Sequence, residues 1–126
     1  MTIELSFCKM VFFENYVIST INEGEVVSQE KSNLQTQVLM DHFKDRPFVY
    51  ITHRINSYSV DPTIYFETSK FSALAGFVVV SKEKPGIKNA IYEKAFLNKP
   101  FEIFEDLEDA ILWADNLCNM KKKLGY

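Results

Sequence analysis

The sequence predicts an α/β fold: a mainly parallel, mixed sheet of about five strands with an N-terminal antiparallel hairpin and four helices. Three observations support this prediction. Residues 48–52 and 74–80 are continuous apolar runs, which are typical of parallel strands covered by helices on both faces. Segments with helical spacing follow these runs, so strands and helices alternate along the chain. The N-terminal region contains β-prone segments with a turn signal, Glu14-Asn15, between them.

The first half of the chain is expected to form the hairpin, one helix and one buried strand. The two arms of the hairpin lie within residues 3–13 and 16–21. Residues 28–44 contain neither Gly nor Pro and place apolar side chains at roughly helical spacing, which indicates a helix. Pro47 then ends the helical region, and the buried strand 48–52 follows.

The second half is expected to alternate helix and strand to the end. A helix begins near Pro62, and another spans residues 85–96 after the buried strand 74–80. A short strand at residues 101–104 leads into the clearest helix of the chain. Its apolar side chains recur every three or four residues: Leu107, Ala110, Ile111, Ala114, Leu117 and Cys118. Acidic residues at its start and Lys121–Lys123 at its end complement the helix dipole.

Length and composition indicate one domain spanning residues 1–126. The chain is 47% hydrophobic and 25% charged, and its eleven Phe and six Tyr can fill a core without disulfides or metal. The net charge of −3 disfavours nucleic acid as a partner, because phosphate binding depends on clustered Lys and Arg. No signal peptide and no apolar run long enough for a membrane span is evident, so we expect a soluble cytoplasmic protein.

The motifs of common enzymes are missing. The four glycines are scattered, which excludes a phosphate-binding loop and a dinucleotide fingerprint. Cys8 and Cys118 have no metal-ligand spacing and suggest buried thiols, although a bridge between them stays open. His42 and His53 have no partner at metal-binding or catalytic spacing. We therefore expect no enzymatic activity, no catalytic residue, no metal and no cofactor; an unrecognised arrangement of Tyr58, His53 and a glutamate is the least favoured alternative.

The best candidate site is the junction between strand 48–52 and the next helix. Asp61-Pro62 is a strong helix start, because the carboxylate can accept from the amides of Thr63 and Ile64. Open α/β sheets bind ligands at the carboxyl ends of their strands, where this junction lies. The candidate partner- or ligand-binding residues are Arg54, Asn56, Ser57, Tyr58, Ser59 and Asp61.

Two interpretations of this junction are open. In the functional one, Ser57 or Ser59 is phosphorylated and the phosphate is held by spare amides and by Arg54. In the structural one, the loop satisfies its own backbone while Arg54 pairs with a carboxylate and Tyr58 packs. In either case the rim is expected to include residues 22–25 and 81–84, which follow neighbouring strands.

Two segments resemble the STAS-like, SpoIIAA-like proteins of bacteria. One is residues 54–62, and the other is residues 101–114, which contain a Phe-x-x-Leu-Glu-x-Ala-x-x-Trp pattern. Its members here are Phe104, Leu107, Glu108, Ala110 and Trp113. The resemblance extends to the order of elements over nearly the whole chain.

The resemblance implies a non-catalytic module that binds a protein partner, as anti-sigma-factor antagonists do. In those proteins a kinase phosphorylates a Ser or Thr at the start of the helix that follows the strand matching residues 48–52. The matching segment here, residues 56–62, has no Gly and no Asp-Ser pair. A related lipid-binding architecture makes a carrier or sensor of a small hydrophobic ligand the main alternative. The oligomeric state stays open, with a homodimer among the alternatives.

Overall fold

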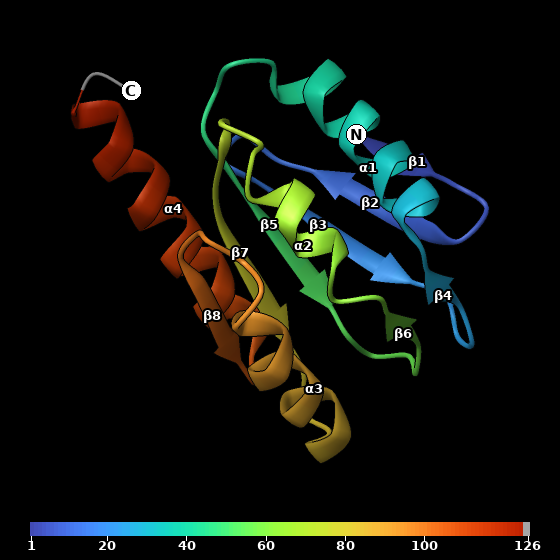
Figure 1. Cartoon of the computed structure of the whole chain (residues 1–126). Coiled ribbons are helices and arrows are strands. Elements are labelled where there is room, and N and C mark those ends of the chain that lie inside the picture. The colour runs from blue at the N-terminus through green and yellow to red at the C-terminus, as the bar shows by residue number, and fades with distance from the viewer. Residues whose placement is uncertain (125–126) are drawn as a thin grey trace.

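The computed structural model describes residues 1–124; Gly125 and Tyr126 lie outside the described residues. Strands and helices alternate through most of the chain (Figure 1). In chain order the elements are β1 (Thr2–Glu4), β2 (Cys8–Phe12), β3 (Tyr16–Ile21), β4 (Val26–Val27), α1 (Gln29–Phe43), β5 (Phe48–His53), β6 (Ser59–Val60), α2 (Ile64–Thr68), β7 (Leu74–Val80), α3 (Lys84–Lys94), β8 (Phe101–Phe104) and α4 (Leu107–Lys123).

The main sheet is mixed and has the strand order β1-β2-β3-β5-β7-β8. The first three strands pair antiparallel, and β3, β5, β7 and β8 run parallel to one another. The two apolar runs are neighbours in this parallel part, with Ile51 opposite Val78. The predicted fold class is therefore confirmed. Six strands form the sheet rather than about five, because the segment before Glu14 folds back on itself to form both β1 and β2.

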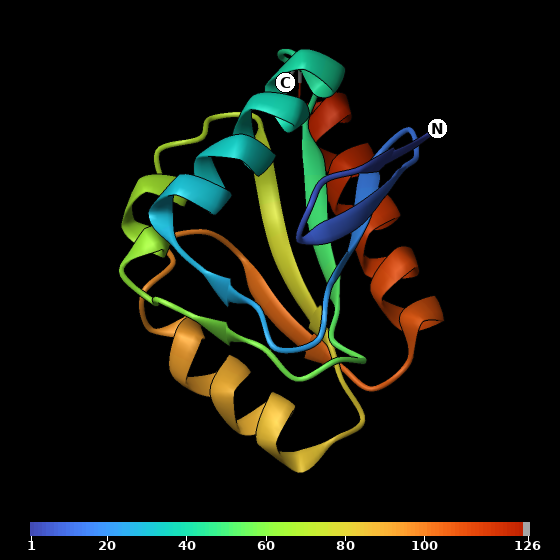
Figure 2. The same ribbon diagram turned by 90° about the vertical axis from the view of Figure 1, so that its right-hand side faces the viewer.

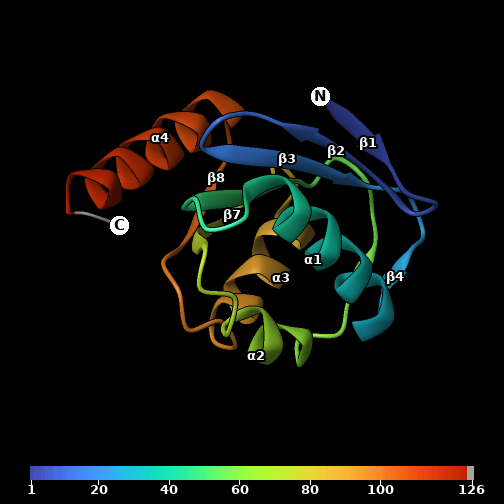
Figure 3. The same ribbon diagram turned by 90° about the horizontal axis from the view of Figure 1, so that it is seen from above.

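Helices cover both faces of the sheet, with α1, α2 and α3 on one side and α4 on the other (Figure 3). Side chains of α1, α2 and α3 belong to one buried cluster, and those of α4 belong to a second. The first cluster is rich in aromatic rings, and Tyr50, Phe77 and Phe101 form a ladder across β5, β7 and β8, with centroid distances of 5.0 and 5.2 Å. Stacked rings bury large apolar areas, so this ladder fixes the face against which α2 and α3 pack.

Small residues let α4 approach the opposite face closely. Ala110, Ala114 and Cys118 are fully buried along this helix. A Cβ at Gly76 of β7 would lie 2.8 Å from the Trp113 ring, so a glycine is required where this ring lies on the strand. The two cysteines are free and buried in different clusters, Cys8 on the α1 side and Cys118 on the α4 side.

Two local features differ from the prediction. A second, two-stranded sheet joins β4 to β6, which the sequence did not reveal because each strand has only two residues. The helix expected from Pro62 begins at Ile64 instead, after a turn in which Ile64 N–H donates to the carbonyl of Asp61 at 3.1 Å. In residues 1–124, none of the helices combines the length and the apolar character that crossing a membrane requires.

Candidate functional site

The loop between β5 and α2 meets two other strand exits at one rim of the sheet. Backbone hydrogen bonds join it to the segment after β3: Gly24 N–H donates to Ser57 O at 2.7 Å, and Ser59 N–H to Glu25 O at 3.0 Å. Arg54 Nη1 reaches the start of α3 and donates to Gly86 O at 3.3 Å. The expected meeting of residues 22–25 with the loop after β5 is therefore observed.

Arg54 lies at the centre of this rim but inside the protein. It is 8% exposed and forms a two-pronged ion pair with Glu93 of α3, which is 5% exposed, at 2.9 and 3.0 Å. Tyr65 Oη donates to the same carboxylate at 2.5 Å, and Arg54 Nε donates to Tyr58 Oη at 3.0 Å. The four side chains, called here the rim network, connect β5, α2 and α3 to one another.

The electrostatics of the rim network favour its charged pair. Burial alone would lower the pKa of Arg54, but the hydrogen bonds and charge of Glu93, together with Tyr58, outweigh burial and raise it. Burial and the negative charge of Glu93 raise the pKa of Tyr65 well above its usual value, so its hydroxyl stays protonated and donates. The structural interpretation therefore describes Arg54 correctly, because its guanidinium pairs with the Glu93 carboxylate.

Gly86 makes the approach of α3 to the rim possible. A Cβ at this position would lie 2.4 Å from the Ser81 hydroxyl and 3.4 Å from the Arg54 side chain. A larger residue would displace the Ser81 hydroxyl or shift the first turn of α3, whose Gly86 carbonyl accepts from Arg54.

Most of the other predicted site residues also hold the loop in place. Asn56 Nδ2 donates to Ile21 O at 2.9 Å, and Tyr58 Oη bonds to Thr52 Oγ1 at 2.8 Å. The Asp61 carboxylate accepts from the amide and the hydroxyl of Thr63, at 3.0 and 2.7 Å, and these bonds lower its pKa. The expected bond from the Ile64 amide to this carboxylate is wrong, because that amide is used by the Asp61 carbonyl in the turn.

Among the predicted site residues, Ser57, Ser59 and Asp61 are exposed. The Ser57 amide donates to both carboxylate oxygens of Glu23, at 3.1 and 2.9 Å. The loop is therefore fixed at this point by an exposed acidic side chain.

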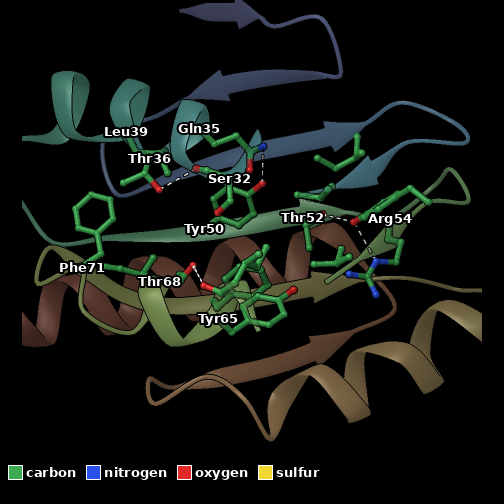
Figure 4. A pocket seen from close by; sticks show the side chains of 17 residues that line it. Ser32, Gln35, Thr36, Leu39, Tyr50, Thr52, Arg54, Tyr65, Thr68 and Phe71 are labelled. Atoms are coloured by element: carbon green, nitrogen blue, oxygen red, sulfur yellow. Dashed lines mark hydrogen bonds between the residues drawn. The ribbon is translucent and has the colours of Figure 1, made fainter. Parts of the chain in front are cut away.

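A cavity of about 50 Å³ lies beneath the loop, between α1, α2 and the sheet (Figure 4). Its walls combine apolar side chains, such as Leu39 and Leu74, with polar ones. Gln35 of α1 points toward Tyr50 on β5 and donates to its hydroxyl at 3.0 Å and to Ser19 at 3.3 Å. The cavity thus has an apolar interior with a small set of directed polar groups.

A second hollow opens on the outside, between β6 and α3. This groove, of about 220 Å³, is lined by Tyr58, Ser59, Val60, Pro62, Asn89, Tyr92 and Glu93. Next to it lies an aromatic cluster, in which Phe96 contacts Phe66 at 5.7 Å and Tyr92 at 5.3 Å between ring centroids. Phe66 and Tyr92 are largely exposed.

Sequence reasoning missed Glu93 and Gln35. Both had a weak signal, because each is a polar residue on the apolar side of its predicted helix: Glu93 lies three residues after Ala90, and Gln35 four residues before Leu39. The groove had no such signal, because it forms from elements far apart in the chain.

The architecture and this rim define a SpoIIAA-like fold. No family model matches the chain, and no curated protein matches it. A solved structure that does match is an uncharacterized protein from the DUF3478 family with a SpoIIAA-like fold, from Shewanella loihica PV-4. The two are 14% identical, with a TM-score of 0.55 over 85% of this chain and 91% of that chain. The similarity shows the fold, which confirms the resemblance of the sequence to SpoIIAA-like proteins.

Proposed function

We propose that this chain is a non-catalytic binding module that recognises a protein partner through its rim surface, defined as residues 54–66 with the exposed side of α3. The observation that supports it most is the exposure of large apolar side chains there: Ile55, Phe66 and Tyr92. Exposed aromatic residues beside a groove are typical of protein interaction sites. The rim network holds this surface rigid from below, which limits the entropy lost on binding.

Phosphorylation of Ser57 would regulate this module by opening the loop. A phosphate adds about −1.5 to −2 charges at neutral pH. It would stand beside the Glu23 carboxylate that now accepts from the Ser57 amide, so the two negative groups would repel each other. Arg54 is held by Glu93 and is not free to neutralise the phosphate.

The test of partner recognition is affinity purification of the full chain from its own host, with quantitative mass spectrometry. Phe66→Ala removes an exposed ring of the rim surface, and Leu112→Ala is the matched control, because Leu112 is equally accessible on α4 across the sheet. We expect a partner that is recovered with the wild type and with Leu112→Ala but lost with Phe66→Ala. Equal recovery by all three proteins would exclude recognition through the rim surface.

The second candidate is binding of a small amphiphilic ligand in the cavity beneath the loop. It is favoured by the polar groups of Gln35 and Tyr50, which bond to each other at the wall of a largely apolar space. The cavity of about 50 Å³ has room for only a few heavy atoms, so the ligand is small or inserts just one end of its chain.

Native mass spectrometry of protein purified from its host tests the second candidate. We expect a retained small molecule in the wild type and its loss in Thr36→Phe, because Thr36 lines the cavity and a ring there fills it. If the wild type has the mass of the bare chain, the cavity is not a ligand site.

A further inference from the structure

We propose that the partner binds as an extended segment, which adds a strand to the free edge of β6 in the groove between β6 and α3. The inference rests on the partner-binding function proposed above and names the partner class: a protein segment with an aromatic or aliphatic residue next to acidic residues.

The first argument concerns the backbone of β6. Ser59 and Asp61 donate their amides to Glu25 and Val27, so these residues face β4. Backbone groups alternate in direction along a strand, and the amide and carbonyl of Val60 therefore face the other way. Figure 2 shows β4 and β6 side by side, with α3 beyond β6 on the side away from β4. The free edge of β6 consequently lies along the groove, where an extended peptide can pair with it.

The second argument concerns the shape and chemistry of the groove. Its far wall is α3, which contributes Asn89 and Tyr92. Tyr92 is 62% exposed, so its ring offers an apolar surface that a partner side chain can cover. Asn89 presents an amide that can bond to the outer edge of an added strand. A backbone edge on one side and an aromatic wall on the other are the two parts that strand addition uses for affinity and specificity.

The third argument is charge. The exposed charged residues of α3 are Lys84, Lys88 and Lys94, whereas its single acidic residue, Glu93, is buried and paired with Arg54. Lys88 precedes Tyr92 by four residues and therefore shares its face of the helix. Across β6, Glu25 is paired with Lys31 at 2.7 Å. The exposed charged residues of α3 beside the groove are thus basic in an acidic protein, which favours an acidic segment.

Selection from a phage library of random peptides, with the full chain as bait, tests the inference. Fluorescence polarisation then measures the affinity of the chain for synthetic copies of the selected peptides. We expect selected sequences with an aromatic or aliphatic residue flanked by Asp or Glu. Val60→Pro removes the amide that faces the groove and keeps both donors to β4. We expect Val60→Pro and Tyr92→Ala each to weaken binding by about tenfold or more.

The matched control is Leu112→Ala, because Leu112 is 61% exposed on α4, which packs on the opposite face of the sheet. It should bind as the wild type does. Since Val60→Pro could perturb folding, hydrogen exchange of the wild type provides a second measurement: the Val60 amide should exchange more slowly when peptide is bound. A selected peptide that leaves this exchange unchanged overturns strand addition.

The outcomes separate the inference from the function on which it rests. If a host partner is lost with Phe66→Ala but no peptide is selected and Val60→Pro still recovers the partner, partner recognition stands and strand addition is wrong. If Phe66→Ala changes nothing, both are wrong. If the purified chain is a dimer and Val60→Pro dissociates it, the segment that pairs with β6 belongs to a second copy of the chain. Binding to vesicles of phosphatidylglycerol, reduced by Lys88→Glu but not by Val60→Pro, would make it a membrane. Either result overturns the proposed peptide.

Discussion

Arg54 and Glu93 form a buried ion pair that positions the residues of the rim surface above it. Both side chains are almost fully removed from water, and such desolvation costs several kcal/mol per ion. Their two parallel hydrogen bonds, the Tyr65 hydroxyl and the Gly86 carbonyl offset this cost by satisfying the polar atoms of the pair. The pair contributes geometry as much as stability, because it fixes α3 relative to β5.

Removing one partner of this pair should destabilise the fold strongly. We expect Glu93→Leu to lower the free energy of unfolding by about 3–5 kcal/mol, because Arg54 is left buried and uncompensated. Urea unfolding measures the change. The double variant Arg54→Met with Glu93→Leu should be more stable than Glu93→Leu alone, because it leaves no buried charge without a partner.

The surface pair between Lys70 and Glu67 provides the control for the buried pair. Both of its side chains are mostly exposed, so Lys70→Ala should cost less than about 1 kcal/mol. A cost for Glu93→Leu as small as this one would contradict the role assigned to the rim network.

At the residue level the sequence predicted where the rim lies but not what its residues do. The position of Arg54 after a buried strand was sufficient to place it at the rim. Its partner Glu93 lies 39 positions away, and no pattern in the sequence connects them. The hydroxyls of Ser57 and Ser59 were expected directly before a helix start, but Ser59 lies in β6, which is too short to predict, and the helix begins only at Ile64.

Among the elements, α4 and α2 mark the two extremes of predictability. The sequence of α4 combines an apolar stripe, an acidic start and a basic end, and the helix spans Leu107–Lys123 as this pattern indicates. Only five residues form α2, because turn bonds to the carbonyls of Asp61, Pro62 and Thr63 precede its first full helical turn. Helix-start signals located the region correctly but not the first helical residue.

Close packing of α4 on β7 makes Gly76 sensitive to substitution. A methyl group there would lie 2.8 Å from the Trp113 ring and 3.0 Å from Leu117, so α4 would have to shift. We expect Gly76→Ala to lower the free energy of unfolding by about 1–3 kcal/mol. The fluorescence of Trp113, the chain's one tryptophan, reports the unfolding in urea.

Gly24→Asn is a suitable control for this substitution. Gly24 has a φ of 79°, which asparagine tolerates better than most residues, and its surroundings are open. We expect it to cost less than Gly76→Ala. A Gly76→Ala protein as stable as the wild type would show that α4 can move away from β7 at little cost.

For the whole molecule, the two buried clusters make the fold sensitive to alkaline pH. Burial raises the pKa of Cys118 to about 11 and that of Cys8, Tyr50 and Tyr65 above their ordinary values. In the unfolded chain the thiols lose their protons near pH 9 and the phenols near pH 10, while the folded chain retains them. The unfolded state then binds fewer protons, so the free energy of unfolding falls as pH rises.

The expected decline begins near pH 9 and steepens above pH 10, with a slope of about 1.4 kcal/mol per pH unit for each group that titrates. The part due to Cys118 ends near pH 11. Urea unfolding in the presence of a reductant, at a series of pH values, measures the decline. Tyr50→Phe should reduce the slope above pH 10, and a constant stability up to pH 11 would contradict the burial of these groups.

The fold as a whole was more predictable than the site, for a physical reason. Apolar runs and helical periodicity are repeated over many residues, so the parallel sheet of β5 and β7 and the layering of helices follow from the sequence. The cavity and the groove depend on a few side chains from distant segments, such as Gln35 on α1 and Tyr92 on α3. Such convergence has no local signature and required the structure.

Tyr58 and Val60 line both the cavity and the groove, so the same two side chains form part of the wall of each. A side chain in such a position cannot move into the cavity without enlarging the groove, or into the groove without enlarging the cavity. The cavity and the proposed docking groove therefore change shape together when either of these two side chains moves.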